Sequence, residues 1–330
     1  MNKRRKLVLA LGAGVFTASF GSFAQPQGKV WRIGYLDSAS RQSTVDSGRY
    51  ASLIQGLSEQ GYFEGKNIVI EARYAESDEQ LLNSLAGDLA GQKLDLILST
   101  GTAATQALQR TKTTIPIVVT VSVDPVSDGF AVSLARPGKN ITGMSLGNEE
   151  TVQKLVELLI LAVPKSKRIT VLVNPANGGH APLLSRIKDA ARLVGKQADP
   201  VNVRTPSEID RGFESMAREH TDAVIILGDA FLFSQRTRIA GLALKHRLPS
   251  AYPQPLYAEV GGLLSYGSDT NENFRRAAIF VKKIFKGERA GDIPFELPTR
   301  YYLVVNRKTA VALGIKLDGE LMARADKVIE

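Results

Sequence analysis

The sequence contains no cysteine, and only three histidines and one tryptophan occur among its 330 residues. Without cysteine the chain has no disulfide framework and no residue that can carry a lipid anchor. The histidines, at positions 180, 220 and 246, form no metal-binding motif. A GxSxG motif, a Walker A motif and a GxGxxG motif in a strand–helix context are also missing. We therefore predict that the protein is not an enzyme and uses no cofactor.

Long apolar runs and long charged tracts are missing from the body of the chain. After residue 24 no apolar run reaches the roughly 18 residues that span a bilayer. Basic residues are spread along the sequence, so no nucleic-acid partner is predicted. A hydrophobic content of 44% and a charged content of 23% are ordinary for a globular protein. The length is sufficient for two domains.

The first 24 residues have the pattern of a secretory signal peptide. Basic residues at positions 3–6 precede an apolar segment at 7–20, and Ser22 and Ala24 are small residues suited to a cleavage site. We expect cleavage near Ala24 and a periplasmic mature protein with 38 basic and 33 acidic residues. An uncleaved N-terminal anchor is the alternative.

Strand-like and helix-like segments alternate after the signal, which is typical of a parallel α/β sheet. The pattern then restarts. Residues 32–36, 95–98 and 114–117 correspond in order to segments that begin 136, 127 and 133 residues later, at Arg168, Asp222 and Arg247. This repeat predicts two similar Rossmann-like lobes with parallel sheets, although chance correspondence within one α/β chain is an alternative.

The C-terminal part of the sequence does not begin a third lobe. We expect the strand at 262–266 to cross back to the first lobe and residues 294–298 to cross to the second. With a first crossing near 145–148, these segments make a three-strand hinge. The predicted organisation is a signal peptide at 1–24, a first lobe at 29–145 plus 262–294, and a second lobe at 146–261 plus 295–330.

Ligands of open parallel sheets bind at the carboxyl ends of the strands, so the residues at those ends are candidates for a ligand site. The first lobe contributes hydroxyls, a helix start and an acid, and the second lobe and the crossing contribute amides, acids and a tyrosine. The candidates are Ser38, Thr100, Thr102, Ala103, Ser122, Asp124, Asn174, Asn177, Asp229, Tyr266 and Asp269.

The two sets of candidates are complementary in charge. In the stretch DLILSTGTAATQAL (95–108), Thr102 is the expected N-cap of a helix whose free N–H groups suit a carboxylate. Asp229 and Asp269 suit an ammonium group. Together they predict a zwitterionic ligand such as an amino acid. An ordinary turn or capping role is the alternative for each residue, and His180 is expected at the surface.

Several segments resemble the ABC-transporter substrate-binding proteins of the TrpX-like group, over about residues 29–314. They are RIGYLDSAS, GLSEQGYFEGKNIVIEARYAE, DLILSTGTAATQAL, IPIVVTVSVDPV, LARPGKNITGMS and NPAN. The resemblance implies the type I periplasmic-binding-protein fold, with two lobes that close on a small-molecule solute.

The same resemblance implies delivery of the solute to an ABC transporter permease in the inner membrane. Some members of the group bind aromatic amino acids, so the implied solute is an amino acid or a similar small carboxylate. A periplasmic sensing module for a membrane receptor is the alternative, and a secreted enzyme is a further one.

Overall fold

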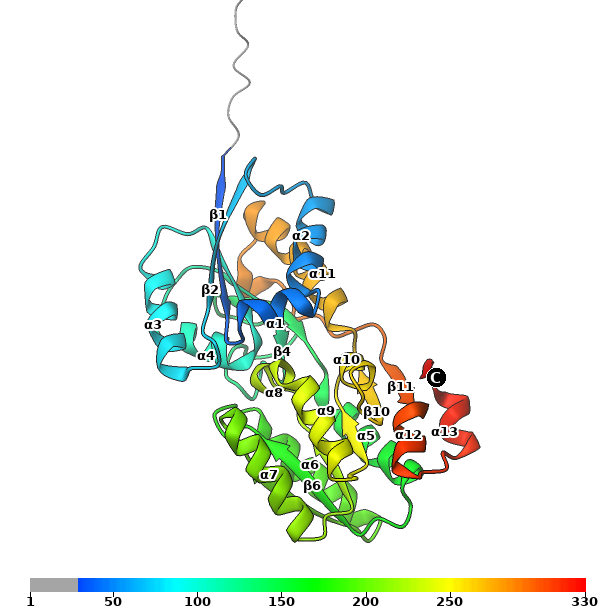
Figure 1. Ribbon diagram of the computed structural model, residues 1–330. Coiled ribbons are helices and arrows are strands. Elements are labelled where there is room, and N and C mark those ends of the chain that lie inside the picture. The colour runs from blue at the N-terminus through cyan, green and yellow to red at the C-terminus, as the bar shows by residue number, and fades with distance from the viewer. Residues whose placement is uncertain (1–28) are drawn as a thin grey trace, which may run out of the picture.

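The computed structural model describes residues 29–330 and contains two α/β lobes (Figure 1). The predicted signal peptide and its cleavage site lie outside the described residues. Within 29–330, no helix combines the length and the apolar character needed to cross a membrane.

The first lobe contains a sheet of five parallel strands in the order β2-β1-β3-β4-β5. Its strands are β1 (Trp31–Asp37), β2 (Ile68–Tyr74), β3 (Leu96–Thr100), β4 (Ile117–Ser122) and β5 (Ile141–Ser145). Its helices from this part of the chain are α1 (Arg41–Asp46), α2 (Arg49–Glu59), α3 (Glu79–Ala90) and α4 (Gly101–Arg110). The central strand β3 is buried along its whole length, which explains its continuous apolar run.

The second lobe contains a seven-stranded sheet in the order β12-β11-β10-β9-β8-β6-β7. Its strands are β6 (Arg168–Val173), β7 (Gln197–Asn202), β8 (Ala223–Ile226), β9 (Ser250–Tyr252), β10 (Leu264–Gly267), β11 (Tyr302–Asn306) and β12 (Lys327–Ile329). Its helices are α5 (Asn148–Ala162), α6 (His180–Leu193), α7 (Pro206–Arg218), α8 (Ala230–Ser234), α9 (Arg236–Lys245), α10 (Pro255–Glu259), α12 (Arg307–Leu313) and α13 (Gly319–Arg324).

The internal repeat is confirmed by the strand order of the two sheets. The order β7-β6-β8-β9-β10 in the second lobe reproduces β2-β1-β3-β4-β5 in the first. The corresponding sequence segments therefore lie in equivalent strands, β1 with β6, β3 with β8, and β4 with β9. Only the second sheet is extended further, by the antiparallel strand β11 and then β12.

The segment that was predicted to cross back at 262–266 belongs instead to the second sheet. Strand β10 pairs with β9 through Ser265 and Tyr252, and with β11 through Leu264 and Val305. It is the second lobe's equivalent of β5, and its buried residues complete that lobe's core. The prediction was wrong because a buried strand with glycine at both ends gives no sign of which sheet it joins. The chain crosses after Gly267 and enters α11 (Thr270–Phe285).

The return to the second lobe runs beside β5. The amide of Ser145 donates to the carbonyl of Glu296 at 2.8 Å, and the amide of Glu296 donates to the carbonyl of Gly143 at 2.9 Å. These bonds follow the short helix η1 (Ala290–Asp292) and lie within the predicted crossing at 294–298. Residues 126–135, between β4 and β5, form turns and bends.

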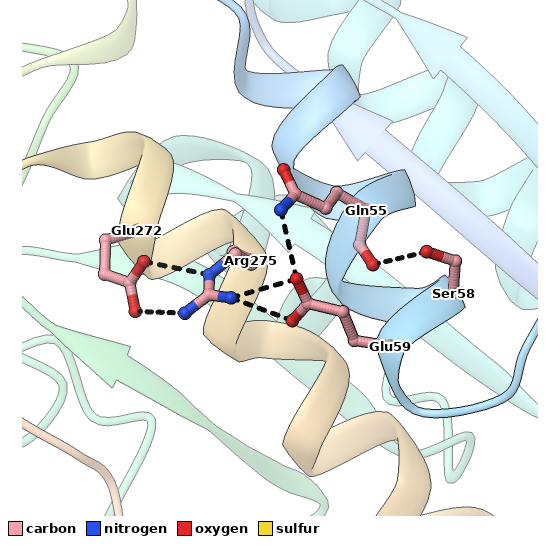
Figure 2. A network of polar contacts seen from close by, with 5 residues as sticks. All are labelled: Gln55, Ser58, Glu59, Glu272 and Arg275. Atoms are coloured by element: carbon pink, nitrogen blue, oxygen red, sulfur yellow. Dashed lines mark hydrogen bonds and ion pairs between the residues drawn. The ribbon is translucent and has the colours of Figure 1, made fainter.

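Helix α11 packs against α2, although Arg275 of α11 and Glu59 of α2, which bond to each other, are 216 residues apart in the sequence (Figures 1 and 2). Arg275 donates through Nη1 to both carboxylate oxygens of Glu59 at 2.9 Å, and through Nε to Glu272 at 3.0 Å. Gln55 donates to the same Glu59 at 3.0 Å. Exposed ion pairs of this kind contribute little to stability. The close approach of the two helix backbones depends on Gly56, where a Cβ atom would lie 2.1 Å from the carbonyl oxygen of Arg275.

We expect Gly56→Ala to lower the free energy of unfolding by about 2 kcal/mol, because the added methyl group meets backbone that cannot rotate away. Helix propensity alone would favour alanine by about 1 kcal/mol. The matched control is Gly87→Ala in α3, where an added Cβ meets no atom within 4 Å; it should gain roughly 0.5–1 kcal/mol. Denaturant unfolding measures both variants. Equal stabilisation by the two would show that α2 and α11 are not in backbone contact.

Candidate functional site

Two adjoining pockets lie between the lobes, and Asp229 lines both of them. We call them the Phe231 pocket and the Arg49 pocket. The Phe231 pocket is lined by Ser38, Ser77, Asp78, Glu79, Leu82, Ala103, Gln106 and Arg110 of the first lobe and by Asn174, Ala176, Asp229 and Phe231 of the second. The Arg49 pocket is lined by Arg49, Thr100, Gly101, Thr102, Val121, Val123, Leu146, Asn177, Gly228, Asp229, Ala230 and Gln254.

Asp229 is the acid that the second lobe presents to this cleft. It follows β8, is 9% exposed, and caps α8 by accepting from the amide of Leu232 at 3.0 Å. The side-chain amides of Asn174 and Asn177 donate to its two oxygens at 3.2 and 3.0 Å. These partners are all neutral, so the carboxylate keeps its charge uncompensated and suits a cationic group.

The turn between β3 and α4 faces Asp229 from the first lobe. Its N-cap is Thr100 rather than the predicted Thr102, because the helix begins at Gly101. The Thr100 hydroxyl donates to the Tyr35 hydroxyl at 3.2 Å and makes no capping bond. With no side chain capping it, the N-terminal turn of α4 can accept an anion.

The two strand-end turns that correspond in the sequence meet in the cleft. A Cβ atom placed on Gly101 would lie 3.7 Å from that of Ala230, at the start of α8. The hydrogen of the Thr102 hydroxyl is already engaged, because this hydroxyl donates to Asp128 at 3.2 Å. Burial raises the pKa of Asp128 to about 6, against the effect of that hydrogen bond and with a contribution from Asp124.

The remaining predicted residues divide between the cleft and other places. Ser38 and Ala103 line the Phe231 pocket, and the Ser38 hydroxyl is buried with no partner among the described residues. Ser122 is buried at the end of β4 but lines neither pocket. Asp124 accepts from Ser127 and Val126 of its own turn and lines a third pocket.

Tyr266 and Asp269 do not reach the cleft. The ring of Tyr266 stacks on Tyr301 with centroids 5.9 Å apart and packs on the core of the second lobe. Asp269 is exposed, caps α11 by accepting from the amide of Asn271 at 2.9 Å, and lines a separate pocket. Asp229 is therefore the one predicted cation ligand that the structure places in the cleft. No cluster of side chains suited to a metal ion occurs within 29–330.

Arg49 is a cleft residue that the sequence did not indicate. It is 5% exposed, and its Nη2 atom donates to Gln254 at 3.0 Å and to Thr270 at 3.4 Å. Its guanidinium lies 3.6 Å from the ring centroid of Phe233 in the second lobe. Burial lowers the pKa of Arg49 to about 10, with Asp37 opposing the shift, so the group is still charged at neutral pH. An arginine at the start of an amphipathic helix ordinarily lies in solvent, and no local pattern distinguishes this one.

His180, expected at the surface, is 1% exposed. Its Nδ1 accepts from the amide of Asn174 at 3.0 Å, so Nε2 carries the hydrogen and donates to the carbonyl of Gly228 at 3.1 Å. The ring thus joins the ends of β6 and β8, which present Asn174 and Asp229 to the cleft. The glycine-rich sequence around it suggested an open loop and gave no signal of this role.

We expect acid to destabilise the protein through His180. Burial lowers the pKa of this imidazole although Asp229 opposes the shift, and protonation of Nδ1 would set a hydrogen against the Asn174 amide. A lowered native pKa means that the unfolded chain binds more protons below about pH 6.5, so stability falls as the pH drops below that value.

His180→Asn, which cannot titrate, should therefore show a flatter dependence of unfolding free energy on pH between about 6.5 and 5. The matched control is His220→Asn at an exposed position with a positive φ of 53°, which should leave the slope unchanged. Thermal unfolding at several pH values measures this. An unaltered slope in His180→Asn would assign the acid sensitivity to other groups.

Comparison with known proteins identifies the family. Residues 43–329 match the model of the ABC transporter substrate binding protein family. The chain belongs to this family. Its members are non-enzymatic components of transport, as the missing catalytic motifs predicted. The fold is that of the type I periplasmic binding proteins.

Three relatives illustrate the similarity. A tyrosine-binding protein of Clostridioides difficile (strain R20291) is 26% identical over 263 residues, which cover 80% of this chain and 75% of the relative. The structure of an ABC domain from Streptococcus pneumonia in complex with L-Trp has a TM-score of 0.83 at 25% identity, over 91% of this chain and 99% of that one. The ligand-free, open structure of a substrate-binding protein with adhesive properties from Clostridium difficile has the same identity and coverages but a TM-score of 0.63.

Proposed function

We propose that the protein is the periplasmic binding component of an ABC importer, and that it closes on an amino acid with an aromatic side chain. The observation that carries this proposal is the pairing within one cleft of Asp229 and the start of α4. Asp229 suits the ammonium group of such a ligand, and the helix start suits its carboxylate. The two ends of a zwitterion are thus matched from opposite lobes.

The Phe231 pocket suits the side chain of an aromatic amino acid. Leu82, Ala103 and Phe231 provide apolar surface, while Gln106 and Arg110 provide polar groups. Tyrosine and tryptophan likewise combine an apolar ring with one polar atom that needs a partner when buried. The names of two relatives, a tyrosine-binding protein and a complex with L-Trp, support the same class of ligand.

Closure of the lobes is the proposed mechanism. At equal sequence identity the TM-score is higher against the L-Trp complex than against the ligand-free, open relative, which supports a closed arrangement of the lobes. A ligand that contacts both lobes stabilises the closed state relative to the open one. The permease would then distinguish the loaded from the empty protein by its shape.

Asp229→Asn should weaken the binding of L-tyrosine and L-tryptophan by about 10- to 100-fold, because the amide removes the charge that pairs with the ammonium group. Isothermal titration calorimetry measures this. The matched control is Asp269→Asn, which removes an exposed cap outside the cleft and should leave the affinity unchanged. Failure of the unmodified protein to bind either amino acid would reject the proposed ligand class, and equal affinity in Asp229→Asn would reject the role of Asp229.

The transport role predicts a cellular phenotype. Cells that lack the protein should take up labelled L-tyrosine or L-tryptophan more slowly when the amino acid is scarce, and the unmodified gene should restore the rate while Asp229→Asn should not. Normal uptake without the protein, combined with binding in solution, would favour a sensing role over transport.

A further inference from the structure

We propose that Arg49 binds the carboxylate of the ligand, so that the affinity of the cleft depends on that group. The inference rests on the proposed function and adds a specificity-determining residue to it. Arg49 begins α2 in the first lobe, and its side chain lines the pocket at the junction of the two lobes.

The charge of Arg49 is buried without a hydrogen-bonded anion. Among residues 29–330 it is the one lysine or arginine that is buried. Its hydrogen-bond partners, Gln254 and Thr270, are neutral, and its Nε is buried with no partner among the described residues. A buried cation is costly unless a counter-charge is bound to it.

The nearby acid Asp37 does not fill this role. It is 1% exposed, and it accepts hydrogen bonds from the Tyr35 hydroxyl at 3.0 Å, the Thr44 hydroxyl at 2.8 Å and the amide of Ala39 at 2.9 Å. It acts on Arg49 only through its charge, and its own burial raises its pKa. The guanidinium thus retains donors for a further acceptor.

The position of these donors suits a ligand carboxylate. The Arg49 pocket also contains Thr100, Gly101 and Thr102, where α4 starts without a side-chain cap. A planar guanidinium matches the geometry of a carboxylate, and a helix start favours the same charge. Asp229 lines this pocket too, so the carboxylate and ammonium groups of one α-amino acid can be bound at adjacent points.

Binding at Arg49 would also couple the ligand to closure. Gln254 and Phe233 belong to the second lobe, and Arg49 contacts both. Closure without a ligand buries the positive charge of Arg49 with no bound counter-charge. A ligand carboxylate bound to the guanidinium neutralises that charge. Ligands without a carboxylate would leave that charge uncompensated and would be selected against.

The test compares L-tryptophan with tryptamine, which lacks only the carboxylate, by calorimetry on the full mature chain. The unmodified protein should prefer L-tryptophan, and in Arg49→Met the affinity for L-tryptophan should fall by about 10- to 100-fold. In that variant the preference for L-tryptophan over tryptamine should shrink by the same factor, and the start of α4 accounts for any preference that remains. An unchanged preference for L-tryptophan overturns the assignment of Arg49.

The matched control is Arg236→Met. This arginine stacks on the same Phe233 ring at 4.7 Å and donates to the Phe233 carbonyl, but it does not line the pocket. It should keep the preference for the carboxylate. If circular dichroism shows that Arg49→Met is unfolded, Arg49→Gln serves instead. Glutamine removes the charge but keeps polar atoms near Gln254. An unchanged preference in that variant overturns the inference equally.

The outcomes separate this inference from the proposed function. If the unmodified protein binds neither L-tryptophan nor L-tyrosine, both are rejected. If it binds them and Arg49→Met leaves the preference over tryptamine unchanged, only the role of Arg49 is rejected. Asp229→Asn should act on the ammonium end of the ligand. This variant should lose the preference for L-tryptophan over indole-3-propionate, which lacks the ammonium group. It should keep the preference for L-tryptophan over tryptamine.

Discussion

Parallel strands all end at the same edge of a sheet, and this constraint determines where the chemistry of the protein lies. In both lobes the same order of five strands brings β3 and β8 to equivalent places. Each of these two strands ends in a turn that starts a helix, and the two turns meet at Gly101 and Ala230. The residues between them differ, with a helix start on one side and Asp229 on the other. A symmetric scaffold thus produces an asymmetric cleft.

The two charged groups of the cleft, Asp229 and Arg49, are positioned by different sets of neutral partners. Asp229 is supported by the side-chain amides of Asn174 and Asn177, and the His180 ring joins the backbone of Asn174 to that of Gly228. Arg49 is supported by an amide, a hydroxyl and an aromatic ring. Neutral partners position a charge without cancelling it, so each group remains able to attract an opposite charge. Rigid support combined with uncompensated charge is what a selective site for a zwitterion requires.

The strands, the repeat and the cleft at the strand ends were predictable because they depend on local apolar runs and on a general rule for parallel sheets. The residues that were missed depend on distant partners. Arg49 is buried by Phe233 and Gln254, nearly 200 or more residues away, and no pattern near position 49 reveals them. His180 follows two glycines, and its burial depends on where Gly228 lies. Strand β10 also depends on distant partners, because its sequence predicts a strand but does not indicate which sheet the strand joins.

The packing of α11 on α2 has a consequence for the order in which the protein can fold. The first lobe is complete only when a helix near residue 280 joins strands that were synthesised long before, and Arg275 and Glu59 are 216 residues apart. Contacts of such separation slow folding, because a long loop must close before they form. Residues 29–145 therefore emerge from the ribosome as an unfinished domain, with the apolar face that α11 later covers still open. Folding of the first lobe therefore has to wait until α11 has been synthesised.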